Sequence, residues 1–245
     1  MVPWLGPRDP FPPPATARRS PNGLLAAGGG LAVPRLLDAY RQGVFPWFSD
    51  GEPVLWWCPD PRMVLPTDAM HVSASLARRL KRGGHRVTAD TAFVDVVRAC
   101  AEPRRDDGGT WITAEMLDAY ATLHRAGHAH SVEVWVDGAL AGGIYGVAVG
   151  RAFFGESMFS RVTDGSKIAV AWLAAQLRRW DVPFIDCQVP SDHLASLGAV
   201  PLGRGEFLAA LPHLVDQPAL PAVWRLDPAL TGAVVAAEAR PAARP

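Results

Sequence analysis

The alternation of hydrophobic and polar positions predicts a group of β-strands in the second half of the chain. From Ser131 to Val136 every second residue is a valine, with Ser, Glu and Trp between them, which is the period of a half-buried strand. The pair Asp137-Gly138 follows, and this dipeptide favours a tight hairpin turn. Apolar segments at 139–149 and 152–159 are then expected to complete an antiparallel meander.

Helical patterns with recognisable ends lie on both sides of this meander. Ser73 and Thr113 stand where a helix N-cap is expected, and Gly43 and Gly127 stand where helices should end. Helices are predicted over 34–42, 73–81, 91–101, 113–125, 164–180, 191–197 and 206–211, with extended segments at 85–88, 183–189 and near Val200.

Antiparallel strands, a helix and a further strand in this order indicate an α+β fold. We predict a small N-terminal α/β domain over 21–65 and a larger domain over 66–225. The Pro-rich segment 1–20 and the Ala- and Pro-rich segment 226–245 are predicted to be disordered tails.

Composition narrows the classes of function. With 245 residues and 49% hydrophobic content the chain can bury a substantial core. The 24 basic side chains equal the 24 acidic ones, which excludes a protein that coats nucleic acid indiscriminately.

Cys58, Cys100 and Cys187 form no CxxC, which argues against a disulfide framework or zinc site. The first residues lack the pattern of a signal peptide and no run of apolar residues could span a bilayer, so we expect a soluble, cytoplasmic protein.

Three polar side chains stand in apolar surroundings. Glu156 lies between pairs of bulky apolar residues, where a carboxylate needs a partner or a shifted pKa; a surface Glu beside a turn fits the pattern equally well. Asp186 and Gln188 are two positions apart in a predicted strand and should project to the same face. They could form a structural hydrogen-bonded pair or a catalytic one.

Aromatic and basic residues suggest contacts with a nucleic acid. Trp47 and Trp111 could stack on bases or pack between domains, and Arg62 could hold a phosphate. A local basic cluster is either a phosphate-binding surface or a solvated helix face; its members are Arg78, Arg79, Lys81, Arg82 and Arg86. Three nearby histidines do not form an HExxH motif, should point apart, and give no expectation of a metal; these are His124, His128 and His130.

The same residues occur in blocks that resemble bacterial leucyl/phenylalanyl-tRNA–protein transferases over residues 20–225. The blocks are PNGLLAAGG (21–29), GVFPWFSDGEPVLWWCPDPR (43–62), GTWIT (109–113), GHAHSVEVW (127–135), GGIYGVAVG (142–150), FGESMFSR (154–161) and DCQVPSDHLASLGA (186–199). This family has an Asp after the glycines, where the chain has Gly30.

The resemblance implies a larger domain similar to the GCN5-related acetyltransferase fold. Residues 160–167 do not form the Gln/Arg-x-x-Gly-x-Gly/Ala loop with which such acetyltransferases grip coenzyme A, which disfavours a coenzyme A-dependent acyltransferase. The implied reaction is transfer of leucine or phenylalanine, and less well methionine, from aminoacyl-tRNA to the α-amino group of proteins beginning with Arg or Lys. Such proteins would be marked for N-degron (N-end rule) proteolysis. We expect no cofactor, no membrane partner and a monomer.

The resemblance also implies roles for single residues. Gln188 would help draw a proton from the acceptor's α-ammonium group or only orient it, Asp186 would orient Gln188, and Glu156 would hold the acceptor's basic first residue. Trp47 and Trp111 would contact the 3′-terminal adenosine, and the basic cluster would bind tRNA phosphates. The donor side chain would enter a pocket of Tyr120, Ile144, Met158, Phe159, Leu173 and Ile185. A tRNA-binding module without chemistry would need the tryptophans and the basic cluster but not Asp186, Gln188 or Glu156.

Overall fold

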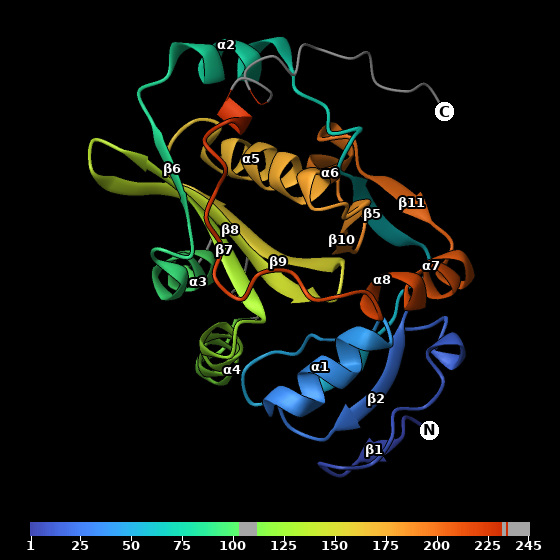
Figure 1. Cartoon of the computed structure of the whole chain (residues 1–245). Coiled ribbons are helices and arrows are strands. Elements are labelled where there is room, and N and C mark those ends of the chain that lie inside the picture. Colours follow the sequence, from blue (N-terminus) through green and yellow to red (C-terminus); the bar gives the residue numbers. More distant parts are fainter. Residues whose placement is uncertain (103–111, 232–233, 235–245) are drawn as a thin grey trace.

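The computed structural model describes residues 1–102, 112–231 and 234, which build two mixed sheets (Figure 1). The smaller sheet has the order β1-β2-β4-β3, in which β1 and β2 are parallel. Its strands are β1 (Trp4–Leu5), β2 (Leu24–Gly28), β3 (Phe45–Pro46) and β4 (Leu55–Trp57), and it is joined by η1 (Pro14–Thr16) and α1 (Val33–Arg41).

The larger sheet has seven strands in the order β11-β5-β10-β9-β8-β7-β6. The predicted meander is confirmed as β7 (Ala129–Val136), β8 (Ala139–Val149) and β9 (Ala152–Ser160), and the pair β9–β10 is parallel. The other strands are β5 (Arg62–Pro66), β6 (Arg86–Ala89), β10 (Phe184–Gln188) and β11 (Val200–Leu202). This architecture agrees with the predicted α+β class.

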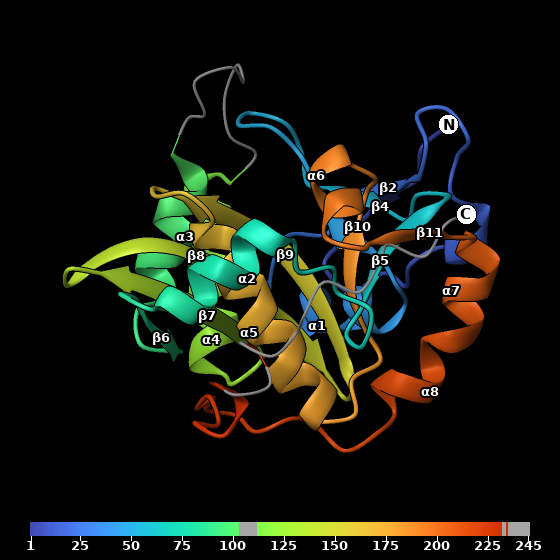
Figure 2. The same cartoon turned by 90° about the horizontal axis from the view of Figure 1, so that it is seen from above.

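Helices cover both faces of the larger sheet. α5 (Gly165–Arg179) packs on one face, whereas α3 (Phe93–Ala101) and α4 (Ala114–Arg125) cover the other (Figure 1). The view from above places α2 (Ala74–Arg82) over α5, on the side of the molecule opposite β11 (Figure 2). The remaining short helices are α6 (Asp192–Ser196), α7 (Arg204–Ala210) and α8 (Pro212–Val215). In the described part of the chain, no helix combines the length and apolar character that crossing a membrane requires.

Local sequence signals account for several of these ends. The Ser73 hydroxyl accepts a hydrogen bond from the Leu76 backbone N–H at 3.3 Å, and the Thr113 hydroxyl accepts one from Met116 at 3.2 Å. Both predicted N-caps are therefore confirmed. Each cap satisfies a first-turn amide that the helix itself leaves without an acceptor.

The N-terminal segment differs from the tail predicted over 1–20. Its β1 pairs with β2, and Leu5, Phe11 and Ala17 are buried in a hydrophobic cluster that also includes residues of α3, α4 and the larger sheet. The guanidinium of Arg35 lies 3.7 Å from the centre of the Phe11 ring and donates a hydrogen bond to the Asp9 carbonyl. Aromatic and cation contacts thus order a Pro-rich segment whose composition alone suggested disorder.

Two other boundaries also differ from the prediction. The predicted division between residues 65 and 66 falls inside β5, which belongs to the larger sheet. In the segment from 226 onward, Leu230 and Val234 are buried in the same hydrophobic cluster as α5, while 232–233 and 235–245 lie outside the described residues. The aromatic stretch from Phe45 to Trp57 contains β3 and β4.

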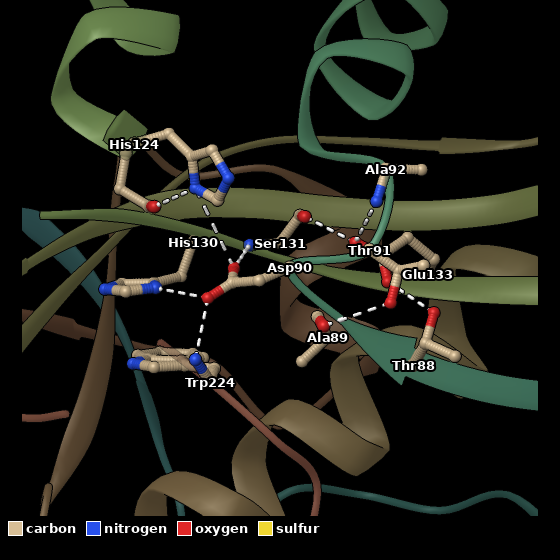
Figure 3. A network of polar contacts seen from close by, with 11 residues as sticks. Thr88, Ala89, Asp90, Thr91, Ala92, His124, His130, Ser131, Glu133 and Trp224 are labelled. Carbon is tan, nitrogen blue, oxygen red and sulfur yellow. Dashed lines mark hydrogen bonds and ion pairs between the residues drawn. The ribbon is translucent and has the colours of Figure 1, made fainter. Parts of the chain in front are cut away.

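A buried polar network ties the C-terminal segment to the larger sheet (Figure 3). Asp90 accepts hydrogen bonds from His130 Nδ1 and from the Trp224 backbone N–H, each at 2.8 Å, and the His130 ring stacks on Trp224 at 4.2 Å between ring centres. His124 Nδ1 lies 4.0 Å from the same carboxylate. His124 and His130, which were expected to point apart, thus both lie near the Asp90 carboxylate. Within the described ranges, no group of three His, Cys, Asp or Glu side chains is placed to hold a metal ion.

Candidate active site

A cavity of about 760 Å³ opens where the smaller sheet meets the larger one. Its wall combines the end of β3, the end of α3, the start of α5 and the adjoining ends of β9 and β10, with α6 at the side. The polar, charged and bulky apolar side chains that line this wall include Trp47, Glu102, Ile144, Glu156, Met158, Phe159, Arg161, Ser166, Ile185, Gln188 and His193. The cavity therefore brings together residues that are more than 100 positions apart in the chain.

Glu156 reaches this cavity because β9 bulges at that residue. Gly146 of β8 pairs with Gly155, and Tyr145 pairs with Ser157, so Glu156 is the extra residue between two paired positions. A bulge of this kind turns a side chain away from the regular alternation of a strand and is common beside active sites. The close approach at the bulge needs a glycine, since a Cβ on Gly146 would lie 2.2 Å from the Phe154 carbonyl oxygen.

Two tyrosines hold the Glu156 carboxyl group. The Tyr40 hydroxyl from α1 and the Tyr120 hydroxyl from α4 each donate a hydrogen bond to it at 2.7 Å, and the two hydroxyls lie 2.6 Å apart. Burial raises the pKa of Glu156 to about 7, although these two hydrogen bonds work in the opposite direction. Near neutral pH the carboxyl group can therefore be ionised by a small favourable interaction, such as a cation bound in the cavity.

Asp186 and Gln188 do not project side by side. β10 bulges between them, and Gln188 has a positive φ of 59°. As a result Gln188 lines the cavity together with Ile185 and Cys187, while Asp186 is buried behind it. The simple rule that residues i and i+2 of a strand share a face fails here because of this local change of backbone. The Gln188 side-chain nitrogen is buried and has no hydrogen-bond partner in the described part of the protein.

Arg62 is not available to hold a phosphate, contrary to the sequence-based hypothesis. Its side chain is 0% exposed and donates two parallel hydrogen bonds to the Asp186 carboxylate, at 2.8 Å from Nε and 2.6 Å from Nη2. A third bond, at 3.0 Å, joins its Nη1 to the Gly43 carbonyl. Burial disfavours the charge, but the Asp186 carboxylate outweighs this effect and raises the pKa of Arg62.

The tryptophan proposed to contact adenosine stands at the mouth of the cavity. Trp47 is 42% exposed, and its ring centre lies 5.7 Å from that of Trp57. The Trp57 indole N–H donates a hydrogen bond to the Trp47 carbonyl at 2.6 Å, which fixes the backbone that carries Trp47. Trp111, proposed for the same role, lies outside the described residues.

The predicted donor pocket is assembled in part. Ile144, Met158, Phe159 and Ile185 line the cavity. The other two predicted members are not among its lining residues, because Tyr120 is fully buried against Glu156 and Leu173, on α5, is 1% exposed in the core.

Models of known protein families match most of the chain. The model described as leucyl/phenylalanyl-tRNA protein transferase matches residues 64–212, and that of the N-terminal domain of the same transferase matches 29–60. A protein from Thiobacillus denitrificans named leucyl/phenylalanyl-tRNA–protein transferase is 56% identical over 217 residues, which cover 89% of this chain and 95% of that protein. The chain belongs to the leucyl/phenylalanyl-tRNA–protein transferase family.

Other relatives bear the same name. A protein from Nitrosospira multiformis is 54% identical over 227 residues, covering 93% of this chain and 98% of the relative, and one from Stutzerimonas stutzeri is 54% identical over 226 residues, covering 92% and 100%. A solved structure of a functionally unknown conserved protein from Staphylococcus epidermidis aligns with a TM-score of 0.42 at 8% identity, over 74% of this chain and 68% of that one. This last likeness carries no conclusion about fold or function.

In this member of the family the basic cluster lies apart from the cavity wall. Its five residues belong to α2 and to the start of β6 and are not among the cavity's lining residues. Four of the five side chains are exposed, and Arg79, the partly buried one, donates a hydrogen bond to the Gly83 carbonyl. Arg86 also lies over the Trp135 ring, 5.2 Å from its centre.

Reasoning from the sequence missed two residues that the structure brings to the site. Tyr40 belongs to the helical pattern of α1, where an aromatic residue is normally a core residue, and the sequence suggested a phosphate-binding role for Arg62. Tyr40 bonds to Glu156 and Arg62 to Asp186, each more than 100 positions away in the sequence. The sequence signal that could have found Arg62 is the buried acid at Asp186, because a buried carboxylate needs a cationic partner.

Proposed function

We propose that this protein transfers leucine or phenylalanine, and less well methionine, from aminoacyl-tRNA to the α-amino group of proteins that begin with Arg or Lys. The observation that carries the proposal is one cavity in which Glu156 and Gln188 stand beside an apolar wall and the exposed ring of Trp47, in a chain whose relatives are named for this transfer. Acceptors so modified would enter N-degron proteolysis in the cytoplasm.

The proposed chemistry consists mainly of positioning. The α-amine of the acceptor attacks the ester carbonyl carbon that links the amino acid to the terminal ribose, the C–N bond forms, and the ribose oxygen leaves and takes up a proton. The ester is already activated, so we propose that no cofactor takes part. The protein must bring the amine to the carbonyl, help it to lose a proton from an unperturbed pKa of about 8, and stabilise the oxyanion.

Glu156 is proposed to select the acceptor. A carboxyl group with a pKa of about 7 becomes a full anion when an Arg or Lys side chain enters the cavity, because the bound cation stabilises the charged form. A neutral first residue would leave the carboxyl group without a cation to stabilise its charged form. Gln188 is proposed to face the reacting amine, with Asp186 fixing its backbone through a hydrogen bond of 3.0 Å.

The donor is proposed to bind across the mouth of the cavity. Stacking of the terminal adenine on Trp47 would contribute about 1–3 kcal/mol, and the Leu or Phe side chain would enter between Ile144, Met158, Phe159 and Ile185. An apolar slot separates side chains that differ by a methylene group or two only weakly, so overlapping donors are expected. Ile144 is β-branched and therefore stiffer than a linear side chain, which should narrow the slot.

The tRNA body is proposed to lie against α2. Phosphate contacts made by Arg78, Arg79, Lys81, Arg82 and Arg86 would be indifferent to most of the tRNA sequence. The similarity of the larger domain to GCN5-related acetyltransferases remains a prediction. Even a shared fold would not identify the donor substrate.

The choice of donor gives a direct test. The protein is incubated with a peptide beginning with Arg, together with leucyl-tRNA, uncharged tRNA or acetyl-coenzyme A, and the peptide is weighed by mass spectrometry. We expect the mass to rise by one leucine residue with leucyl-tRNA alone. A gain of an acetyl group would identify a coenzyme A-dependent enzyme, and no gain despite binding of leucyl-tRNA would identify a binding module.

A further inference from the structure

Gln188 adopts a backbone conformation that few residues accept. Its φ is 59°, and the backbone N–H of Val189 donates to the Cys187 carbonyl at 2.8 Å. A hydrogen bond across a single central residue with positive φ defines a γ-turn of the rarer, strained kind. Such a conformation persists only where the surroundings hold it in place, and here it turns the Gln188 side chain into the cavity.

The group that holds this turn is the Asp186 carboxylate. Its Oδ1 accepts the Gln188 backbone N–H at 3.0 Å and also Arg62 Nε at 2.8 Å, while its Oδ2 accepts Arg62 Nη2 at 2.6 Å. Two parallel bonds from one planar guanidinium fix both the position and the rotation of a carboxylate. The carboxylate can therefore leave the Gln188 amide only if the pair with Arg62 opens.

Arg62 is itself fixed on every side. Its guanidinium carbon lies 4.9 Å from the centre of the Phe45 ring and 4.6 Å from that of Phe207, and its Nη1 donates to the Gly43 carbonyl. Gly43 begins the segment that runs through β3 to Trp47. Arg62 therefore contacts both the start of the segment that carries Trp47, at Gly43, and the carboxylate that holds Gln188, at Asp186.

We propose that Arg62 is a positioning residue for the transfer reaction. Through Asp186 it holds the strained turn at Gln188, and through Gly43 it fixes the position of this turn relative to the segment that carries Trp47. The proposal rests on the proposed function for its kinetic consequence. The alternative is that Arg62 only stabilises the fold, as a buried arginine anywhere in the core would.

Arg35 is the matched control for that alternative. It is also buried, at 5% exposure, and its guanidinium also stacks on an aromatic ring, that of Phe11, and donates to a backbone carbonyl. The contacts described for its guanidinium are with Asp9, Phe11 and Trp56 and do not include Asp186 or Gln188. Arg35→Lys should disturb the core without disturbing the turn.

The first experiment needs no activity. Hydrogen exchange is followed in the segment 184–190 of the intact wild type, Arg62→Lys and Arg35→Lys. Lys has the charge but cannot supply the two parallel bonds, so we expect exchange of the Gln188 amide to be faster by about tenfold or more in Arg62→Lys and unchanged in Arg35→Lys. Unchanged exchange in Arg62→Lys would overturn the proposal.

The second experiment separates positioning from general stability by a double-mutant cycle. In the transfer assay we expect Arg62→Lys to lower kcat about 10–100-fold with the KM for charged tRNA nearly unchanged. Combining it with Gln188→Ala should give little further loss, since the two act as one unit. If the two losses multiply instead, or if Arg35→Lys lowers kcat equally, Arg62 has only a structural role.

A milder variant protects the test against a failure to fold. Phe207→Leu leaves the hydrogen bonds of Arg62 in place but removes one side of its aromatic stack, and should shift both measurements in the same direction by a smaller factor. If the wild type transfers no amino acid, the proposed function fails, whereas the exchange measurement still decides whether Arg62 clamps the turn.

Discussion

Replacement of Glu156 by Gln tests the proposed acceptor site through its pH dependence. The pKa of Glu156 is raised to about 7 in the free protein, and only the ionised form pairs with a basic first residue. Each pH unit below 7 therefore costs about 1.4 kcal/mol to ionise the group, or a factor of about ten in kcat/KM. Above 7 this factor disappears.

The acceptor amine supplies a second, separable dependence. Its own deprotonation has an unperturbed pKa of about 8, so the wild-type profile of kcat/KM should rise with pH in two steps. In Glu156→Gln the lower step should vanish and the upper one remain. The loss of a charged partner in a partly buried site costs about 2 kcal/mol or more, so kcat/KM at pH 8 should fall at least about 30-fold.

Stability provides an independent reading of the same group. A carboxyl group whose pKa is higher in the folded than in the unfolded state favours folding when protonated, so its contribution is present below the unfolded pKa near 4.5 and is lost as pH rises through about 7. Between pH 5 and pH 8 the free energy of unfolding of wild type should fall by roughly 3 kcal/mol at most relative to Glu156→Gln. Chemical denaturation at both pH values measures this difference. A lower kinetic step that survives in Glu156→Gln, together with parallel stability curves, would refute the assignment.

Three further changes test the donor side. Trp47→Ala should raise the KM for charged tRNA by about 5–150-fold, the equivalent of a stacking loss of 1–3 kcal/mol, while Trp47→Phe recovers most of it; equal KM values in steady-state transfer would exclude stacking at this residue. Ile144→Ala should enlarge the slot and raise the ratio of kcat/KM for Phe over Leu about tenfold, which competition between the two charged tRNAs measures, and an unchanged ratio would place the side chain elsewhere. Neutralising Arg78 and Arg82 together should weaken tRNA binding and lower the slope of log affinity against log salt by roughly one unit or more, and a titration whose slope does not change would remove α2 from the tRNA contact.

The elements predicted correctly from the sequence are those that local rules determine. Ser73 and Thr113 cap their helices through hydrogen bonds to residues three positions away. The alternation from Ser131 onward marks the strand β7 correctly, although Ser131 and Glu133 are buried as well as Val132 and Val134, so the strand is not half-buried as expected. Such signals lie within a few residues of the structure that they predict.

The features that escaped prediction depend on distant contacts. Gln188 joins the cavity through a bulge and a positive φ. The Asp186 carboxylate holds this turn through the Gln188 backbone N–H, and Asp186 is held in turn by Arg62, 124 positions before it in the sequence. Arg62, for which the sequence suggested contact with a phosphate, is fully buried by residues from distant parts of the chain. The order at the N-terminus likewise depends on Arg35 packing against Phe11, which composition cannot reveal.

The cavity with Glu156 and Gln188 is proposed to catalyse transfer to a basic N-terminus. The most direct test follows radiolabelled leucine or phenylalanine from charged tRNA onto peptides that begin with Arg or Ala, with wild type and Gln188→Ala. We predict that label passes to the Arg peptide alone and that the mutant loses most of this activity while charged tRNA still binds. Label on both peptides in equal amounts, or full activity in Gln188→Ala, would contradict the proposed site.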